Sequence, residues 1–304
     1  MRKLFFELVQ VSVGQLDGMS RFPEPDEWRK LFELSRRHAI AGICYHGITR
    51  LQEHGLVAPQ ELSHDWLKEV EQTKEMNRGR SRRLIRLQEE LRTHHLRSSI
   101  ITGPGLARFY DRELQMQRYT RSISLYVFGY RNQVDLNQWK DINVHVFTEL
   151  NAGKANQRNH RFEKWLLLNN DLMFSKVGEL IVPSHAMTII LQIVHLYNLF
   201  LDRQMRLRDL MDLFFVLHYG DENKNQYQFS ERTLEEEIKN LGLTRFTRGI
   251  MWLMKEVFNL DAGHLLAEPL EDEGKFLLNK TMSGNFTLQD WWHKLWYYTF
   301  QNLT

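Results

Sequence analysis

The sequence predicts an α+β protein in which a small mixed sheet is embedded in a predominantly helical chain. Apolar residues recur every three or four positions through about the first hundred residues and again after about residue 155, which is typical of helices. Between these stretches, residues 122–128 and 142–148 alternate apolar and polar side chains, as half-buried strands do. We therefore expect an N-terminal helical region (1–97), a sheet core (98–155) and a C-terminal helical region (156–304).

Composition and charge narrow the class of protein. The 304 residues are 42% hydrophobic and 26% charged, which is an ordinary globular composition. The net charge of +2 excludes a dominant basic surface, so nucleic acid is not the expected partner. Cys44 is the only cysteine, which excludes an internal disulfide and favours the cytoplasm. The most apolar stretch, residues 187–201, is too short for a bilayer of about 30 Å, so no membrane is expected.

The N-terminal region reads as a series of helices. An amphipathic helix opens the chain, Pro25 starts a second, and residues 40–54 form a third that ends at Gly55. Apolar spacing then predicts one long helix over about 63–96. The second half of this helix carries arginines at 78, 80, 82, 83, 86, 92 and 97. This stripe is either a solvated helix face or a surface that binds nucleic acid.

The sheet core and the C-terminal helices follow. Residues 98–101 are a candidate strand, residues 102–105 a glycine turn, and residues 106–110 a short helix. Two alternating strands, 122–128 and 142–148, complete the sheet. Further helices are expected at 158–168, 184–201, 207–219, 231–241, 246–258, 271–281 and 287–300.

This order of elements is the skeleton of a nucleotidyltransferase core. In such a core, two carboxylates at positions i and i+2 of one strand and a third on the neighbouring strand hold the Mg²⁺ that neutralises a nucleoside triphosphate. The glycine turn and the start of its helix present backbone N–H groups to the phosphates.

Residues 100–130 (IITGPGLARFYDRELQMQRYTRSISLYVFGY) resemble the uncharacterised bacterial nucleotidyltransferase family of the DNA polymerase β-like superfamily. That family shows a Leu-Lys-Gly turn, an Ala-x-Leu-Tyr helix and a Gly-Asp-Ile-Asp-Leu-Trp-Val strand. The resemblance continues at residues 142–147, similar to the family's Val-Glu-Ile-His-Phe strand. It continues again at residues 190–213, similar to a His-containing helix followed by Gly-Ile-Gly-Leu-Arg-Gln-Leu-Leu-Asp.

The chain departs from this pattern at the positions that bear the chemistry. Ser122 and Ser124 stand where the resemblance places the paired aspartates, and Asn143 stands at the third acidic position. Arg121 replaces a glycine and Thr102 replaces the lysine of the turn. Because Mg²⁺ requires hard, anionic oxygen ligands, these neutral positions predict no metal site and no confident catalytic residue.

The resemblance therefore implies a nucleotidyltransferase-type protein that has lost nucleotidyl transfer. We expect it to bind a nucleotide, another phosphorylated ligand or a partner protein. The expected ligand-binding residues are Thr102, Gly103, Gly105, Arg118, Arg121, His145 and Arg208. Arg208 and Asp212 are also spaced for an ion pair within one helix.

Two alternatives stay open. The first is an active Mg²⁺-dependent enzyme that transfers a nucleoside monophosphate to a hydroxyl-bearing acceptor. It would need substitute carboxylates, for which the nearby candidates are Asp111, Glu113, Asp135, Asp141 and Glu149. The second is a helical adaptor or nucleic-acid binder that uses the arginine stripe of residues 78–97.

Overall fold

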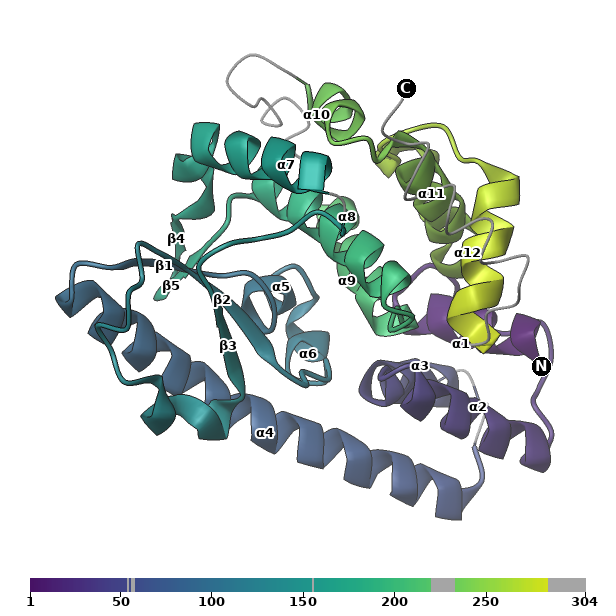
Figure 1. The fold of residues 1–304 in the computed structure, drawn as a ribbon. Helices are drawn as coiled ribbons and strands as arrows, with labels where there is room; N and C mark the ends of the chain where they lie inside the picture. Colours follow the sequence, from purple (N-terminus) through teal and green to yellow (C-terminus); the bar gives the residue numbers. More distant parts are fainter. Residues whose placement is uncertain (54, 56–57, 155, 220–232, 284–304) are drawn as a thin grey trace.

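A mixed sheet lies within a helical protein, as predicted (Figure 1). The computed structural model describes residues 1–304 apart from 54, 56–57, 155, 220–232 and 284–304. The sheet consists of β1 (Arg97–Ile100), β2 (Ile123–Phe128) and β3 (Val144–Phe147). The central strand β2 runs antiparallel to β1 and parallel to β3. A hairpin of β4 (Ser175–Val177) and β5 (Leu180–Val182) lies beside β1.

Helices make up most of the remaining described chain. Before the sheet lie α1 (Arg2–Ser12), α2 (Pro25–Arg37), α3 (Ala41–Glu53) and α4 (Gln60–Thr93). Within the sheet region lie the short α5 (Pro104–Ala107) and α6 (Arg112–Gln115). After it come α7 (Asn156–Leu168), α8 (His185–Leu201), α9 (Leu207–His218), α10 (Leu234–Asn240), α11 (Thr244–Phe258) and α12 (Glu271–Ser283). The helix expected over 287–300 lies outside the described residues.

The long helix α4 connects the N-terminal helices with the sheet (Figure 1). Trp66, near its start, is fully buried in the larger hydrophobic core. Its second half buries Leu84, Leu87 and Leu91 in a smaller core. There these leucines meet the inward face of β2, which consists of Ile123, Leu125 and Val127. The spacing of three and four along α4 and of two along β2 therefore explains why these surfaces pack together.

The larger core joins α1 with helices that follow the sheet. Phe5 of α1 belongs to the same cluster as Phe214 of α9 and Phe258 of α11. The sheet and the second half of α4 form the other core. The division at residues 97 and 155 remains a prediction.

The short helix expected over 106–110 lies instead at Pro104–Ala107. Two other wrong boundaries affect the arginine stripe and the predicted site. The helix α4 ends at Thr93, and Arg97 belongs to β1, so the arginine stripe is not one continuous helix over 78–97. The strand expected over 142–148 is only Val144–Phe147, because residues 136–142 form a 3-10 helix and Asn143 has a left-handed backbone with φ of 53°. Asparagine tolerates this conformation better than most residues, which the alternation pattern does not reveal.

None of the described helices has the length and apolar character needed to cross a membrane. The cytoplasmic location stays a prediction.

Candidate functional site

A cavity of about 800 Å³ lies where the sheet meets α2, α9 and α12. It brings together residues from the glycine turn, β2, β3 and α9 that the sequence singles out: Thr102, Arg118, Arg121, Ser122, Ser124, Asn143, His145 and Arg208. Gly103 and Gly105 are not among its lining residues in the described part of the chain. The neutral positions and the basic residues of the prediction thus line the same cavity.

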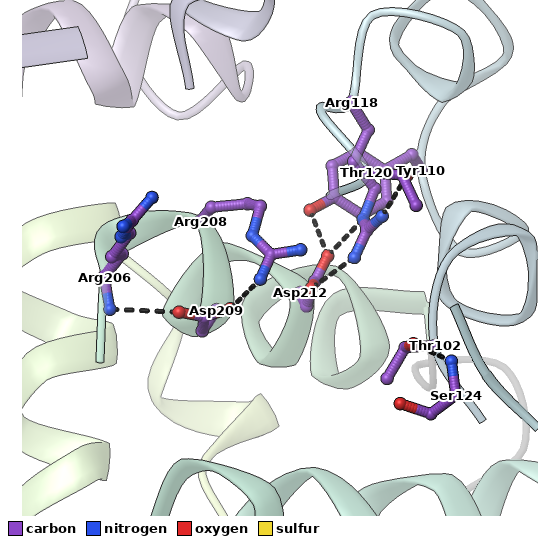
Figure 2. Close-up of polar contacts among 9 residues, drawn as sticks. All are labelled: Thr102, Tyr110, Arg118, Thr120, Ser124, Arg206, Arg208, Asp209 and Asp212. Atoms are coloured by element: carbon purple, nitrogen blue, oxygen red, sulfur yellow. Dashed lines mark hydrogen bonds and ion pairs between the residues drawn. The ribbon is translucent and has the colours of Figure 1, made fainter. Parts of the chain in front are cut away.

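The sheet end of the cavity is organised by Thr102. Its hydroxyl accepts a hydrogen bond of 2.8 Å from the backbone N–H of Ser124 (Figure 2). The backbone N–H of Ile101 donates to the carbonyl of Ser124 at 2.8 Å. Ser124 is paired with His145 across the parallel strands, so both side chains lie on the same face of the sheet. The structure therefore places His145, rather than Asn143, directly beside Ser124.

Asn143 builds the turn that precedes β3. Its side-chain amide donates to the carbonyl of Arg121 at 2.6 Å, and its own carbonyl accepts from the N–H of Ile123 at 3.0 Å. These two bonds fix the start of β2 against the start of β3. The residue at the third acidic position of the resemblance thus has an architectural role.

A buried ion pair between Arg118 and Asp212 belongs to the cavity lining, and Figure 2 shows it between Arg208 and the Thr102–Ser124 contact. Nε and Nη2 of Arg118 each donate to a different carboxylate oxygen at 2.6 Å. The hydroxyl of Tyr110 donates to the same carboxylate at 2.6 Å, and Nη1 of Arg118 donates to Thr120 at 2.8 Å. The side chains of Arg118 and Asp212 are 1% and 3% exposed. The guanidinium of Arg118 is therefore bound to Asp212. A contact between Arg118 and a ligand stays a prediction.

The electrostatics of this pair follow from burial and proximity. Burial disfavours the charged carboxylate of Asp212, but Arg118 outweighs it and keeps the pKa below its ordinary value. Burial also raises the pKa of Tyr110, and the adjoining Asp212 raises it further. The pair is consequently charged, and the phenol is neutral, at physiological pH.

Arg208 does not form the helical ion pair expected from its spacing to Asp212. Its guanidinium is instead ion-paired with Asp209, while Asp212 binds Arg118 (Figure 2). The other oxygen of Asp209 accepts from the backbone N–H of Arg206 at 3.0 Å. Both carboxylates that line the cavity are therefore engaged within the protein.

The rest of the lining is strongly basic. Besides Arg118, Arg121 and Arg208, the wall includes Arg37, Arg203, Arg206 and Lys280, together with His38 and His195. Burial lowers the pKa of His195, and lowers that of His38 to about 4. The sequence prediction did not include the end of α2 or α12. The charge cluster of Arg206, Arg208, Asp209 and Asp212 was the sequence signal for this end of the cavity.

One protein family matches part of the chain, from α2 to α6. Residues 24–114 match the model of a family described as "Uncharacterised nucleotidyltransferase". The match confirms the predicted resemblance to this family over residues 24–114. No curated protein and no solved structure matches the chain.

The nucleotidyltransferase match covers α2, α3, α4, β1, the glycine turn and most of α6. It therefore includes His38 and Thr102 of the cavity. Ser122, Ser124 and Asn143 lie beyond the matched residues, so their correspondence to the acidic positions of that family stays a prediction.

The Mg²⁺ implied by a nucleotidyltransferase fold does not fit the residues present. Ser122 and Ser124 supply neutral hydroxyls, and Asn143 supplies at most a neutral amide oxygen. Among the described residues, no three His, Cys, Asp or Glu side chains gather as a metal site. The substitute carboxylates do not line the cavity in the described chain, and Asp141 is ion-paired with Arg83 at 2.9 Å. A cation would instead face the arginines of the wall.

Two arginines of the stripe attach α4 to the sheet region. Arg80 donates to the carbonyl of Thr120, and Arg83 donates to the carbonyl of Gln138 at 2.9 Å and lies against the Trp139 ring. Arg92 is instead paired at 2.6 Å with Glu89 of the same helix.

The two glycines of the turn have a steric role. Gly103 has φ of 67°, which favours glycine, and a Cβ there would lie 2.9 Å from Ile123. A Cβ on Gly105 would lie 2.3 Å from the carbonyl oxygen of Ile100, which belongs to β1. The turn therefore requires glycine in order to pack against the sheet, whether or not a ligand binds.

Gly105→Ala is expected to lower the free energy of unfolding by about 2–4 kcal/mol, because the new methyl group clashes with strand backbone. Urea denaturation measures the change. Gly79→Ala is the matched control: nothing lies within 4 Å of a Cβ there, in the middle of α4, so it should stabilise the protein by up to about 1 kcal/mol. Equal effects of the two substitutions would contradict the packing role of the turn.

Proposed function

We propose that this protein uses a nucleotidyltransferase fold to bind a phosphorylated ligand of the nucleotide class without transferring a nucleotide. One observation carries the proposal. Basic side chains greatly outnumber carboxylates around the cavity, and both carboxylates are bonded within the protein. The resulting positive field attracts an anion and repels a free cation.

The side chains at the sheet end suit phosphate oxygens. Arg121 is exposed and makes no ion pair within the described chain, so its guanidinium is available for a two-pronged contact with phosphate. The hydroxyls of Ser122 and Ser124 can donate to the same oxygens. Carboxylates at these positions would repel the phosphate unless a metal ion lay between them, whereas serines need no such ion.

The proposal is tested by calorimetric titration with ATP, GTP, CTP and UTP, in EDTA and in excess Mg²⁺. We expect binding in EDTA that Mg²⁺ does not strengthen, and no release of pyrophosphate. Arg121→Ser should weaken the affinity about tenfold or more, because it removes a hydrogen bond between charged groups.

Arg82→Ser is the matched control. Arg82 is exposed on α4 and lies outside the cavity, and the substitution removes the same charge. It should leave the affinity within about twofold of the wild-type value at 0.15 M salt, where exposed charges beyond about 8 Å are largely screened. Binding that appears only with Mg²⁺, or equal losses in both variants, would refute the proposal.

A further inference from the structure

The end of the cavity farthest from the strands is built by helices. It is lined by the end of α2, the segment between α8 and α9, and the last turn of α12. In Figure 2, Arg206 lies on the opposite side of the Arg118–Asp212 pair from Thr102 and Ser124. The cavity therefore has a helical end that is distinct from the sheet end considered above.

His38 in this wall is a buried side chain whose ring nitrogens make no hydrogen bond within the described chain. It is 2% exposed, and neither ring nitrogen has a hydrogen-bond partner among the described residues. Its ring lies 6.0 Å from that of Phe5, and its carbonyl accepts from the N–H of Arg208 at 3.3 Å. An unsatisfied buried polar group costs about 1–3 kcal/mol, so a site that keeps one is suited to a ligand that satisfies it.

The charges around His38 specify which kind of ligand this is. Arg37, its neighbour in sequence, and Arg206 both act electrostatically on the ring and both lie in the cavity wall. Neither guanidinium has an ion-pair partner within the described chain, and both residues are exposed. The positive end of the α9 dipole adds to this field, since α9 begins at Leu207. The imidazole is neutral at physiological pH, so it offers one N–H donor beside two arginines.

We propose that the helical end binds a second phosphate group, held by the ring N–H of His38 and the guanidinium groups of Arg37 and Arg206. The inference rests on the proposed function, because the sheet end holds the first phosphate of the same cavity. A ligand with a chain of phosphates would occupy both ends, whereas a monophosphate would occupy one. The second group is therefore either the terminal phosphate of a nucleotide or a separate inorganic phosphate.

Titrations with ATP, AMP and inorganic phosphate, each with wild type and variants, test this subsite. His38→Phe keeps a ring beside Phe5 but removes the donor, and Arg206→Ser removes an exposed charge. Each should weaken ATP binding about tenfold and leave AMP binding unchanged, whereas Arg121→Ser should weaken both. If inorganic phosphate binds with the same dependence on His38 and Arg206, the second group is a separate phosphate.

The melting temperature of the ligand-free protein is measured alongside the titrations. Because His38→Phe removes an unsatisfied polar group from a buried site, the free protein should melt at a temperature equal to or higher than that of the wild type. Unchanged ATP affinity in His38→Phe and Arg206→Ser, with a loss in Arg121→Ser, would overturn the subsite and leave the proposed function intact. A wild-type protein that binds none of the probes would overturn both.

Discussion

Replacing Asp212 by alanine is expected to lower the free energy of unfolding by about 3–5 kcal/mol, the cost of leaving a buried charge without its partner. The substitution strands the Arg118 guanidinium at 1% exposure and removes the acceptor of Tyr110. Urea denaturation of the two proteins measures the difference. Typical domains have a free energy of unfolding of only about 5–15 kcal/mol, so the expected loss is a large fraction of the total.

Two further variants separate charge from packing. Glu89→Ala removes a carboxylate whose distance to Arg92 is also 2.6 Å, but both side chains are more than half exposed, so its effect on stability should be far smaller than that of Asp212→Ala. The double variant Arg118→Met with Asp212→Leu replaces the buried pair by apolar side chains and should recover much of the loss. A small effect of Asp212→Ala would mean that Arg118 has another anionic partner.

Introducing Ser122→Asp together with Ser124→Asp is expected to convert the cavity from an anion site to a cation site. The two carboxylates would face the cavity from the start of β2, spaced to hold one divalent ion. We expect Mn²⁺ binding by paramagnetic resonance or calorimetry where the wild type has none. Affinity for ATP in EDTA should fall at least tenfold, because negative charge is added beside the phosphate.

The control for this design is Ser122→Asn with Ser124→Asn, which has nearly the same shape and no charge. It should gain no affinity for Mn²⁺. Asn143 is left unchanged, because its amide nitrogen holds the carbonyl of Arg121 and its left-handed backbone disfavours glutamate. A folded aspartate variant that binds no divalent ion would show that the two side chains do not converge.

The sheet was predictable because its signals are local. The alternation of Ile123, Leu125 and Val127 follows from the geometry of a strand, and these residues are buried as expected. The family resemblance was also found without a structure, from residues 100–130, 142–147 and 190–213, although the family model matches residues 24–114. The predicted start of the third strand was wrong because Asn143 has a left-handed backbone. Such a residue ends the strand, but the sequence still alternates apolar and polar side chains across it.

The sequence alone determined the α+β class and the order of the main helices and of the three sheet strands. It also has neutral residues at the positions where the resemblance expects acidic ones. Tertiary structure decided what each polar residue contacts. Arg118 and Asp212 are 94 positions apart, and no local pattern assigns Asp212 to that arginine rather than to Arg208 on its own helix. In the same way, no local sequence pattern predicts that His38 lines the cavity. Electrostatic interactions and burial depend on the distances between side chains in the folded protein. Only the packing of α2, α9 and the sheet sets those distances.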